Sequence, residues 1–413
     1  MKVAIIGSGI SGLVAAHELH STHEITVFEA SGRAGGHTRT AEVRLGGDRL
    51  AVDMGFIVYN ERTYPGLVHL FENLDVATQE TEMSFGVRCD RTGLEWGSRG
   101  VRGVAAQPRN LLRPRFLGML RDIFRFNREA PQLLSTPQEK VSLGDYVRGG
   151  GYGDAFVDHY LVPMGAAIWS ASVEDFLHFP ATTFVRFFHN HGLLSTSPDL
   201  SWRVVKGGSQ RYVERLVESF SHRIRVNCPV LSVRRSEDSV TLKTAHGAER
   251  FDEVILAVHS DQALALLDDP SDEEQAILSA IRYQENHVVL HTDGRFLPQR
   301  EAARASWNYR IPRRPSDRVF VTYDMNRLQR IDSERPLLVT LNSPEPIGSP
   351  QILDEFTTQH PVFDARAAEA QSRWSEISGQ QRTHYCGAYW RFGFHEDGLQ
   401  SALAVTASLQ SAA

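Results

Sequence analysis

Cysteine is scarce in this sequence, with only Cys89, Cys228 and Cys386 among 413 residues. The three are widely spaced, so they form neither a C-x-x-C metal pattern nor the density of a disulfide scaffold. No metal site is therefore expected, and the low cysteine content favours a reducing, cytoplasmic compartment.

The sequence also lacks a long apolar run and an excess of positive charge. No apolar stretch reaches the roughly 18 to 20 residues that a membrane-spanning helix needs, and a strand predicted from residue 2 leaves no room for a signal peptide. We therefore expect a soluble, cytoplasmic protein that is at most peripheral at the inner face of the membrane. The formal net charge of −6 argues against a nucleic-acid partner.

A nucleotide-binding signature stands at the start of the chain. Residues 3–13 read V-A-I-I-G-S-G-I-S-G-L, an apolar strand followed by G-x-G-x-x-G and the start of a helix. Gly7 permits the tight turn, Gly9 leaves room for a pyrophosphate, and Gly12 lets the helix pack closely on the strand. Ser11 lies in the first turn of that helix, whose N-terminus would face the phosphates.

The second predicted strand adds weight to this signature, which is weak on its own. Residues 25–28 are apolar and end at Glu29, at the spacing where a carboxylate accepts hydrogen bonds from the ribose hydroxyls of an adenosine. The same carboxylate would repel a ribose phosphate, which disfavours NADP.

The next segment, Ala30-Ser31-Gly32-Arg33-Ala34-Gly35-Gly36-His37, resembles the R-x-G-G extension of the flavin amine oxidase and phytoene desaturase superfamily. The resemblance implies FAD as the cofactor, with its pyrophosphate contacted by Ala30, Arg33, Gly35, Gly36 and His37. Met54, Gly55 and Phe56 resemble the next flavin-contacting segment of the superfamily. Members usually have arginine in place of His37, so the charge at that contact would depend on pH.

The resemblance continues to about residue 410 and places further FAD contacts at Val230, Gly387, Asp397, Gly398 and Leu399. Asp397 is expected to cap the terminal helix or to contact the ribityl chain, and the N–H groups of Gly398 and Leu399 to stabilise negative charge on reduced flavin. The implied fold is α/β. It has an FAD-binding Rossmann-like domain of the GR2 type (residues 1–80, 205–282 and 375–413) and a discontinuous substrate domain, largely helical plus sheet (81–204 and 283–374).

Four shorter segments, at residues 307–309, 325–329, 360–363 and 393–399, are similar to a bacterial subgroup associated with cyclopropane and methyl-branched fatty acyl synthesis. This similarity implies a lipid or fatty acyl substrate, dehydrogenated or desaturated by hydride transfer to flavin N5. Two alternatives stay open: an amine or amino-acid oxidase that produces hydrogen peroxide, and a non-catalytic flavoprotein partner of a lipid-modifying enzyme.

Two histidines are the catalytic candidates. His287 aligns with a lysine that many members keep near flavin N5, and His395 falls where an amine oxidase has an aromatic cage residue. A structural, hydrogen-bonded role explains either residue equally well, because the chain contains 17 histidines. Tyr389 stands where many members have an acid, and no cysteine occupies the tethering position of the family, so the FAD is expected to be non-covalent.

Two stretches of the expected substrate domain are open to two interpretations each. Residues 163–170 are apolar and small, which fits core packing or a pocket wall. Residues 109–128 hold six arginines and one acid, Asp122. A helix there would have Phe116, Leu120, Ile123 and Phe124 on one face and Arg121, Arg125 and Arg128 on the other. This pattern fits packing on the core, and it also fits a helix lying on an anionic membrane surface.

Overall fold

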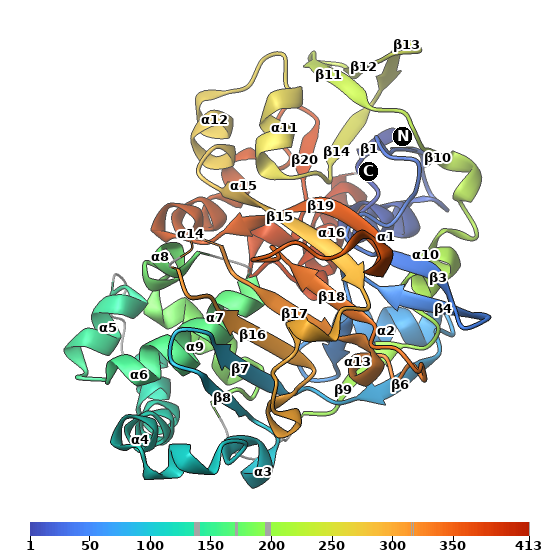
Figure 1. Ribbon diagram of the computed structural model, residues 1–413. Helices are drawn as coiled ribbons and strands as arrows, with labels where there is room; N and C mark the ends of the chain where they lie inside the picture. The colour runs from blue at the N-terminus through green and yellow to red at the C-terminus, as the bar shows by residue number, and fades with distance from the viewer. Residues whose placement is uncertain (136–140, 170–171, 195–199, 315, 317, 413) are drawn as a thin grey trace.

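The computed structural model describes residues 1–135, 141–169, 172–194, 200–314, 316 and 318–412. They form an α/β fold built on a five-stranded and a seven-stranded sheet, with three smaller sheets (Figure 1). Among these residues, no helix combines the length and the apolar character that crossing a membrane requires.

The five-stranded sheet is entirely parallel, in the order β10-β2-β1-β14-β20. In the central strand, Val3 and Ile5 belong to one apolar core while Ala4 and Ile6 belong to another, so both faces of the sheet are covered. This explains why the strand is apolar throughout instead of alternating. The strands are β1 (Lys2–Ile6), β2 (Glu24–Phe28), β10 (Ile224–Arg225), β14 (Glu253–Leu256) and β20 (Thr383–Tyr385).

Helices α1 (Ile10–Leu19) and α16 (His395–Ala412) pack against each other beside this sheet. The structure also contains three small sheets, β3-β4, β5-β9-β6 and β11-β12-β13. Four further α-helices lie in the first 80 residues and between residues 205 and 282. Their bounds are β3 (Thr40–Leu45), β4 (Asp48–Asp53), β5 (Val58–Asn60), β6 (Thr78–Thr81), β9 (Trp202–Val205), β11 (Val230–Arg235), β12 (Val240–Thr244), β13 (Gly247–Phe251), α2 (Pro65–Asn73), α10 (Gln210–Val217), α11 (Ser260–Leu266) and α12 (Asp272–Leu278).

The seven-stranded sheet has the order β19-β15-β18-β17-β16-β7-β8, and all its pairs are antiparallel except β16 with β7. Its longest pair is β15 with β19, in which Val288 lies opposite Phe356 and His287 opposite Thr357. The strands are β7 (Phe85–Cys89), β8 (Leu94–Gly97), β15 (Arg282–His291), β16 (Trp307–Ile311), β17 (Val321–Asp324), β18 (Leu338–Leu341) and β19 (Ile352–Val362).

Helices occupy most of the chain between β8 and β9, and they share a core rich in phenylalanine. Phe126, Phe156, Phe184 and Phe188 are all fully buried there. The helices are α3 (Gly100–Val104), α4 (Pro114–Glu129), α5 (Leu143–Gly149), α6 (Asp154–Phe156), α7 (Val162–Trp169), α8 (Val173–Leu177) and α9 (Ala181–Asn190); later in the chain come α13 (Met325–Leu328), α14 (Ala365–Ser372) and α15 (Trp374–Ile377).

We propose that the two large sheets are the cores of two domains with the boundaries expected from the sequence. Every strand of the five-stranded sheet lies within 1–80, 205–282 or 375–413. Every strand of the seven-stranded sheet lies within 81–204 or 283–374, apart from the first residue of β15.

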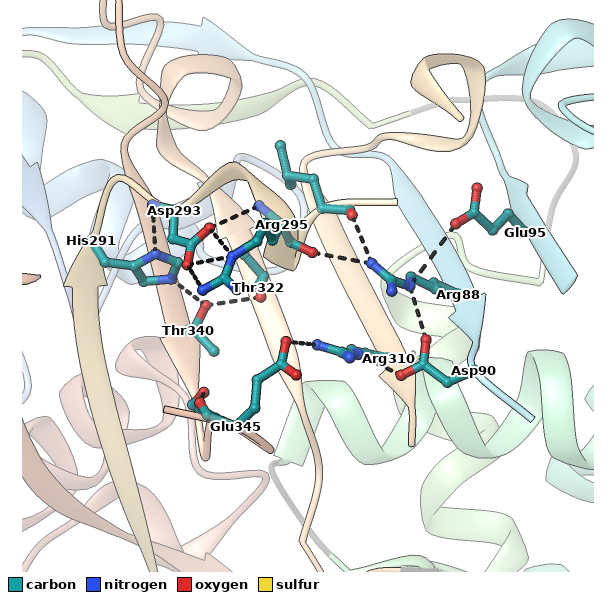
Figure 2. A network of polar contacts seen from close by, with 12 residues as sticks. Arg88, Asp90, Glu95, His291, Asp293, Arg295, Arg310, Thr322, Thr340 and Glu345 are labelled. Carbon is teal, nitrogen blue, oxygen red and sulfur yellow. Dashed lines mark hydrogen bonds and ion pairs between the residues drawn. The ribbon is translucent and has the colours of Figure 1, made fainter. Parts of the chain in front are cut away.

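A polar network crosses the seven-stranded sheet (Figure 2). His291 is fully buried, and its Nδ1 accepts a hydrogen bond from the N–H of Asp293 at 3.1 Å. Its Nε2 therefore carries the proton and donates to Thr340 at 2.7 Å. Farther along the sheet, Asp90 joins Arg88 to Arg310 through ion pairs of 2.9 and 2.7 Å.

Acidification is expected to destabilise the protein through His291. Burial lowers the pKa of His291 from 6.5 to about 4. The unfolded chain therefore takes up a proton first as the pH falls, and stability that is complete above pH 6.5 is lost toward pH 4. The full effect is about 3 kcal/mol. Urea unfolding of the wild type and of His291→Gln at pH 7 and pH 4 measures it. The variant should lose less stability between these two pH values, and equal losses would contradict the prediction.

Candidate active site

The glycine loop at the end of β1 has the geometry of a phosphate-binding turn. Gly7 adopts a φ of +100°, a conformation that other residues rarely take. A Cβ at Gly12 would lie 1.9 Å from the carbonyl oxygen of Gly7, so only glycine allows α1 to begin this close to β1. A Cβ at Gly9 would meet nothing within 4 Å, because it points into open space.

Two helix N-termini converge on this open space. A Cβ at Gly398 would lie 2.8 Å from Ile10 and 2.9 Å from the hydroxyl of Ser11, so the first turns of α16 and α1 touch. Helix N-termini carry free N–H groups and partial positive charge, and two of them together favour an anion. The N–H of Gly398 donates to the carbonyl of Phe394 at 3.0 Å, which corrects its expected role as a free donor to the flavin, and the next residue, Leu399, is buried with 2% exposure.

Asp397 lies inside the first turn of α16, which corrects its expected place as the N-cap residue. Its Oδ2 accepts a hydrogen bond from the N–H of Phe394, the residue before the helix, at 2.9 Å. The carboxyl thus satisfies a free N–H at the helix start from within the helix. Burial raises the pKa of Asp397 to about 7.

Glu29 joins the glycine turn to the loop that follows β2. The Oε2 of Glu29 accepts hydrogen bonds from the N–H and the hydroxyl of Ser8 at 3.1 and 2.5 Å, and its Oε1 accepts from the N–H of Ser31 at 2.7 Å. Arg33 turns its guanidinium onto its own loop, donating to the carbonyls of Thr38 and Gly36. These hydrogen bonds brace the loop.

Gly35 and Gly36, two further expected FAD contacts, pack against the glycine loop. The N–H of Gly35 donates to the carbonyl of Ser8 at 2.9 Å, and a Cβ at Gly36 would lie 2.8 Å from the Cα of Gly9. Ala30 is exposed beside Glu29, and Val230 begins β11.

Asp53, directly before the expected Met54-Gly55-Phe56 contact, is a buried junction between distant parts of the chain. Its Oδ1 accepts from the hydroxyl of Thr40 at 2.6 Å and from the N–H and hydroxyl of Ser209, both at 2.8 Å. Gln329 donates to Oδ2 at 2.9 Å and accepts from the Asp53 N–H at 2.8 Å. Burial raises the pKa of Asp53 to about 6, so the carboxyl is ionised at neutral pH.

A cavity of about 1050 Å³ extends from the glycine loop to the seven-stranded sheet and the helices packed on it. None of its lining residues within the described chain is Asp, Glu, Lys or Arg. Of the expected FAD contacts, Gly9, Ser11, His37, Met54, Gly55, Phe56 and Gly387 line it. From the predicted small-residue stretch, Met164, Ile168 and Trp169 also line it, whereas Ser170 lies outside the described residues.

His395 lines this cavity as the sequence predicts. Its ring stacks on Phe56 with centroids 3.8 Å apart, and its Nε2 lies 3.0 Å from the hydroxyl of Thr38 and 3.1 Å from that of Tyr212. Burial lowers the pKa of His395 to about 3, so the ring is neutral.

His287 does not line the cavity, which corrects its expected place beside the flavin. Successive side chains of a strand point to opposite faces, and on β15 the neighbouring Val288 faces the cavity. The side chain of His287 is 44% exposed and lies 3.2 Å from Glu355.

Three cavity histidines were not predicted as site residues. His259 follows β14 and stacks on Tyr283 at 4.4 Å, His360 lies on β19, and both approach the ring of His37, at 6.0 and 5.6 Å. The third, His191, stacks on Phe187 at 3.8 Å. Burial lowers the pKa of His259 and His191 to about 4 and that of His360 to about 3. Only His360 belonged to a segment that the sequence singled out.

Three aromatic rings pack together in the cavity wall. The ring of Phe187 lies 4.7 Å from that of Trp169 and 5.0 Å from that of Phe394, and the last two are 6.4 Å apart. The buried Nε1–H of Trp307 has no hydrogen-bond acceptor within the described part of the chain, so it is available to a polar atom of a ligand.

These features fit FAD. The open space at Gly9 and the paired helix N-termini suit a pyrophosphate, and the uncharged cavity suits the flat ring system. No cysteine lines the cavity within the described residues. Cys386 is fully buried, and burial raises its pKa to about 12, so it stays a thiol at neutral pH.

Comparison with known proteins agrees with this assignment. The model of a family described as flavin containing amine oxidoreductase matches residues 10–339. AofH of Mycobacterium tuberculosis, a protein assigned as a flavin-containing monoamine oxidase, is 25% identical over 285 residues. That match covers 65% of this chain and only 59% of AofH. The flavin-dependent L-tryptophan oxidase RebO of Lentzea aerocolonigenes is 44% identical over 55 residues, 13% of this chain and 12% of RebO.

Solved structures share the fold at low sequence identity. Putrescine oxidase superposes with a TM-score of 0.69 at 16% identity, covering 100% of this chain and 99% of its own. A conjugated-linoleic-acid (CLA)-producing fatty acid isomerase from P. acnes gives 0.69 at 18% identity, covering 98% of both chains. Cyclohexylamine oxidase from Brevibacterium oxydans gives 0.69 at 15%, covering 99% of both chains. The family match covers most of the chain, and this chain therefore belongs to the flavin-containing amine oxidoreductase family.

Proposed function

We propose that the substrate is a lipid or fatty acyl chain, which the enzyme dehydrogenates or desaturates. The observation that carries this proposal is the absence of any Asp, Glu, Lys or Arg among the described residues lining the cavity. An amino acid brings a carboxylate and an ammonium group, and each needs a charged partner when buried. A hydrocarbon chain needs only apolar walls. The fold also serves a protein named as a fatty acid isomerase.

FAD bound in the cleft supplies the acceptor for a hydride and thus for two electrons. The chain's own residues then have to exclude water, orient the acyl chain and take up the proton that leaves the neighbouring carbon. Histidines are the only bases among the described lining residues. We assign the proton to His395, because its ring is neutral and therefore free to accept. The imidazolium that forms donates through Nε2 to the hydroxyls of Tyr212 and Thr38, and its low pKa returns the proton to water once the product has left.

Flavin bleaching under anaerobic conditions is expected with a fatty acyl substrate and not with amines or amino acids. The wild type is mixed with an acyl thioester, a detergent-dispersed phospholipid, an aliphatic amine and an amino acid, and the flavin absorbance is followed. His395→Ala should retain FAD and slow bleaching by about a hundredfold, the usual contribution of general acid–base catalysis.

His287→Ala is the matched control, because it removes the same ring from the opposite face of β15 and should react at the wild-type rate. Bleaching by the amine alone would replace the lipid proposal with the amine oxidase alternative. Bleaching by none of the four would favour the non-catalytic partner of a lipid-modifying enzyme. Flavin bleaching at the wild-type rate in His395→Ala would show that this histidine has only a structural role.

A further inference from the structure

Exposed apolar side chains gather on one short part of the molecule. Nine large apolar residues of the described chain are exposed, and five of them fall between residues 101 and 124. They are Val101 (84% exposed), Leu111 (41%), Leu112 (85%), Leu117 (47%) and Phe124 (60%). Val101 lies on α3, Leu111 and Leu112 on the 3-10 helix η1 (Pro108–Leu112), and the other two on α4. These elements follow one another along one edge of the molecule (Figure 1).

The exposed face of α4 combines apolar and basic side chains. Leu117, Arg121, Phe124 and Arg128 recur at steps of three or four residues, so they share one face of the helix. The side chains of Arg121 and Arg128 are 76% and 75% exposed. The sequence predicted the arginines and the apolar residues of α4 on opposite faces, and this is corrected, because Phe124 shares the exposed face with Arg121 and Arg128. The buried residues of the helix are Phe116, Met119, Asp122 and Phe126.

Positive charge on this surface is only partly balanced locally, because Arg121 pairs with Asp122 and Arg128 with Glu129, at 3.3 and 3.0 Å. Residues 100–128 contain seven arginines and a single acid, Asp122, whose side chain is only 3% exposed. Arg102, Arg109 and Arg115 form no ion pair with a carboxylate within the described residues. Arg125 differs from the exposed arginines, because its guanidinium lies 3.8 Å from the ring centre of Tyr152 and donates to the carbonyl of Gly150.

The same elements form a wall of the large cavity. Gly100 and Val104 of α3 and Leu120, Ile123 and Phe124 of α4 line it. Phe124 both lines the cavity and is 60% exposed, so it marks the mouth. The exposed apolar surface therefore lies beside an opening of the cavity that also reaches the glycine loop.

We propose that α3, η1 and α4 dock on the surface of an anionic phospholipid bilayer, so that the cavity opens toward the lipid phase. Exposed leucine, valine and phenylalanine side chains insert among the acyl chains, while the arginines contact lipid phosphates and other anionic groups. This proposal rests on the lipid substrate proposed above, because docking brings the mouth of the cavity to a source of acyl chains.

Vesicle sedimentation tests the docking directly. We expect the FAD-loaded wild type to sediment with vesicles of phosphatidylglycerol and phosphatidylcholine at low salt. It should be released by high salt and should not sediment with phosphatidylcholine alone. The double variant Val101→Asp, Leu112→Asp should lose at least tenfold in partition, although neither residue lines the cavity. Arg102→Gln, Arg109→Gln and Arg115→Gln should each lose about fivefold.

The matched control is Leu231→Asp on β11, which places the same charge on another apolar residue that is 53% exposed. It should sediment like the wild type. Equal sedimentation with neutral vesicles, no sedimentation at all, or a dimer of this chain that the double variant dissociates would overturn the proposal. Bleaching of the flavin by a detergent-dispersed lipid is measured in parallel. It reports the lipid substrate independently of docking, so either proposal can fail alone.

Discussion

Replacing Gly9 with alanine is expected to weaken FAD binding strongly while leaving the fold intact. Gly9 has φ and ψ of −69° and −178°, which alanine adopts freely, and its Cβ would meet no atom within 4 Å. The new methyl group instead enters the space between the N-termini of α1 and α16, where the pyrophosphate fits. We expect the dissociation constant for FAD to rise at least about a hundredfold, the loss of close backbone contact at a phosphate.

The measurement is a fluorescence titration of the apoprotein with FAD, with a thermal melt of each apoprotein to confirm folding. Gly118→Ala is the matched control. Its Cβ also meets nothing within 4 Å, but the position lies in α4, away from the loop. It should bind FAD like the wild type. An unchanged affinity in Gly9→Ala would show that the pyrophosphate lies elsewhere.

Removing the carboxyl of Asp53 is expected to lower the free energy of unfolding by about 3 to 5 kcal/mol, because it leaves buried hydrogen-bond donors of Thr40, Ser209 and Gln329 without an acceptor. Asp53→Ala removes all of these contacts. Asp53→Asn keeps an oxygen for the Thr40 and Ser209 donors and loses only the bond from Gln329, so it should cost about 1 to 2 kcal/mol.

Urea unfolding of the apoproteins measures this graded loss, with Asp48→Ala as the control. Asp48 begins the same strand and is exposed, so its removal should change stability by less than about 0.5 kcal/mol. If the alanine and asparagine variants at position 53 unfolded at the wild-type urea concentration, Asp53 would not be the junction described here.

The cofactor loop was predictable because its constraints are local. The turn at Gly7, the close contact at Gly12 and the carboxylate of Glu29 all lie within the first 29 residues, and each follows from steric rules or strand spacing. The apolar run at residues 3–6 likewise predicted a strand, and the structure covers that strand on both faces.

The polar contacts of the site were less predictable, because they depend on pairing between distant segments. Whether His287 or Val288 faces the cavity follows from the register of β15 against β19, and a shift of one residue would exchange them. Asp53 and Gln329 are 276 positions apart. On α4, Leu117 and Arg121 share a face with Phe124, and the sequence alone did not show which of two overlapping stripes the core would bury.

For the lipid substrate proposed above, a cavity wall without charge would also determine which carbon of the chain is oxidised. The carboxylate or phosphate of a lipid loses its hydration if it enters such a cavity and finds no partner there, so the head group remains outside with the arginines. The tail then reaches the cofactor from a fixed starting point. The distance from Phe124 to His395 would then set how far along the acyl chain the oxidation occurs. Lipids with different head groups would be oxidised at the same depth along the chain. Substitutions that narrow the cavity between these two residues would move the position of the new double bond.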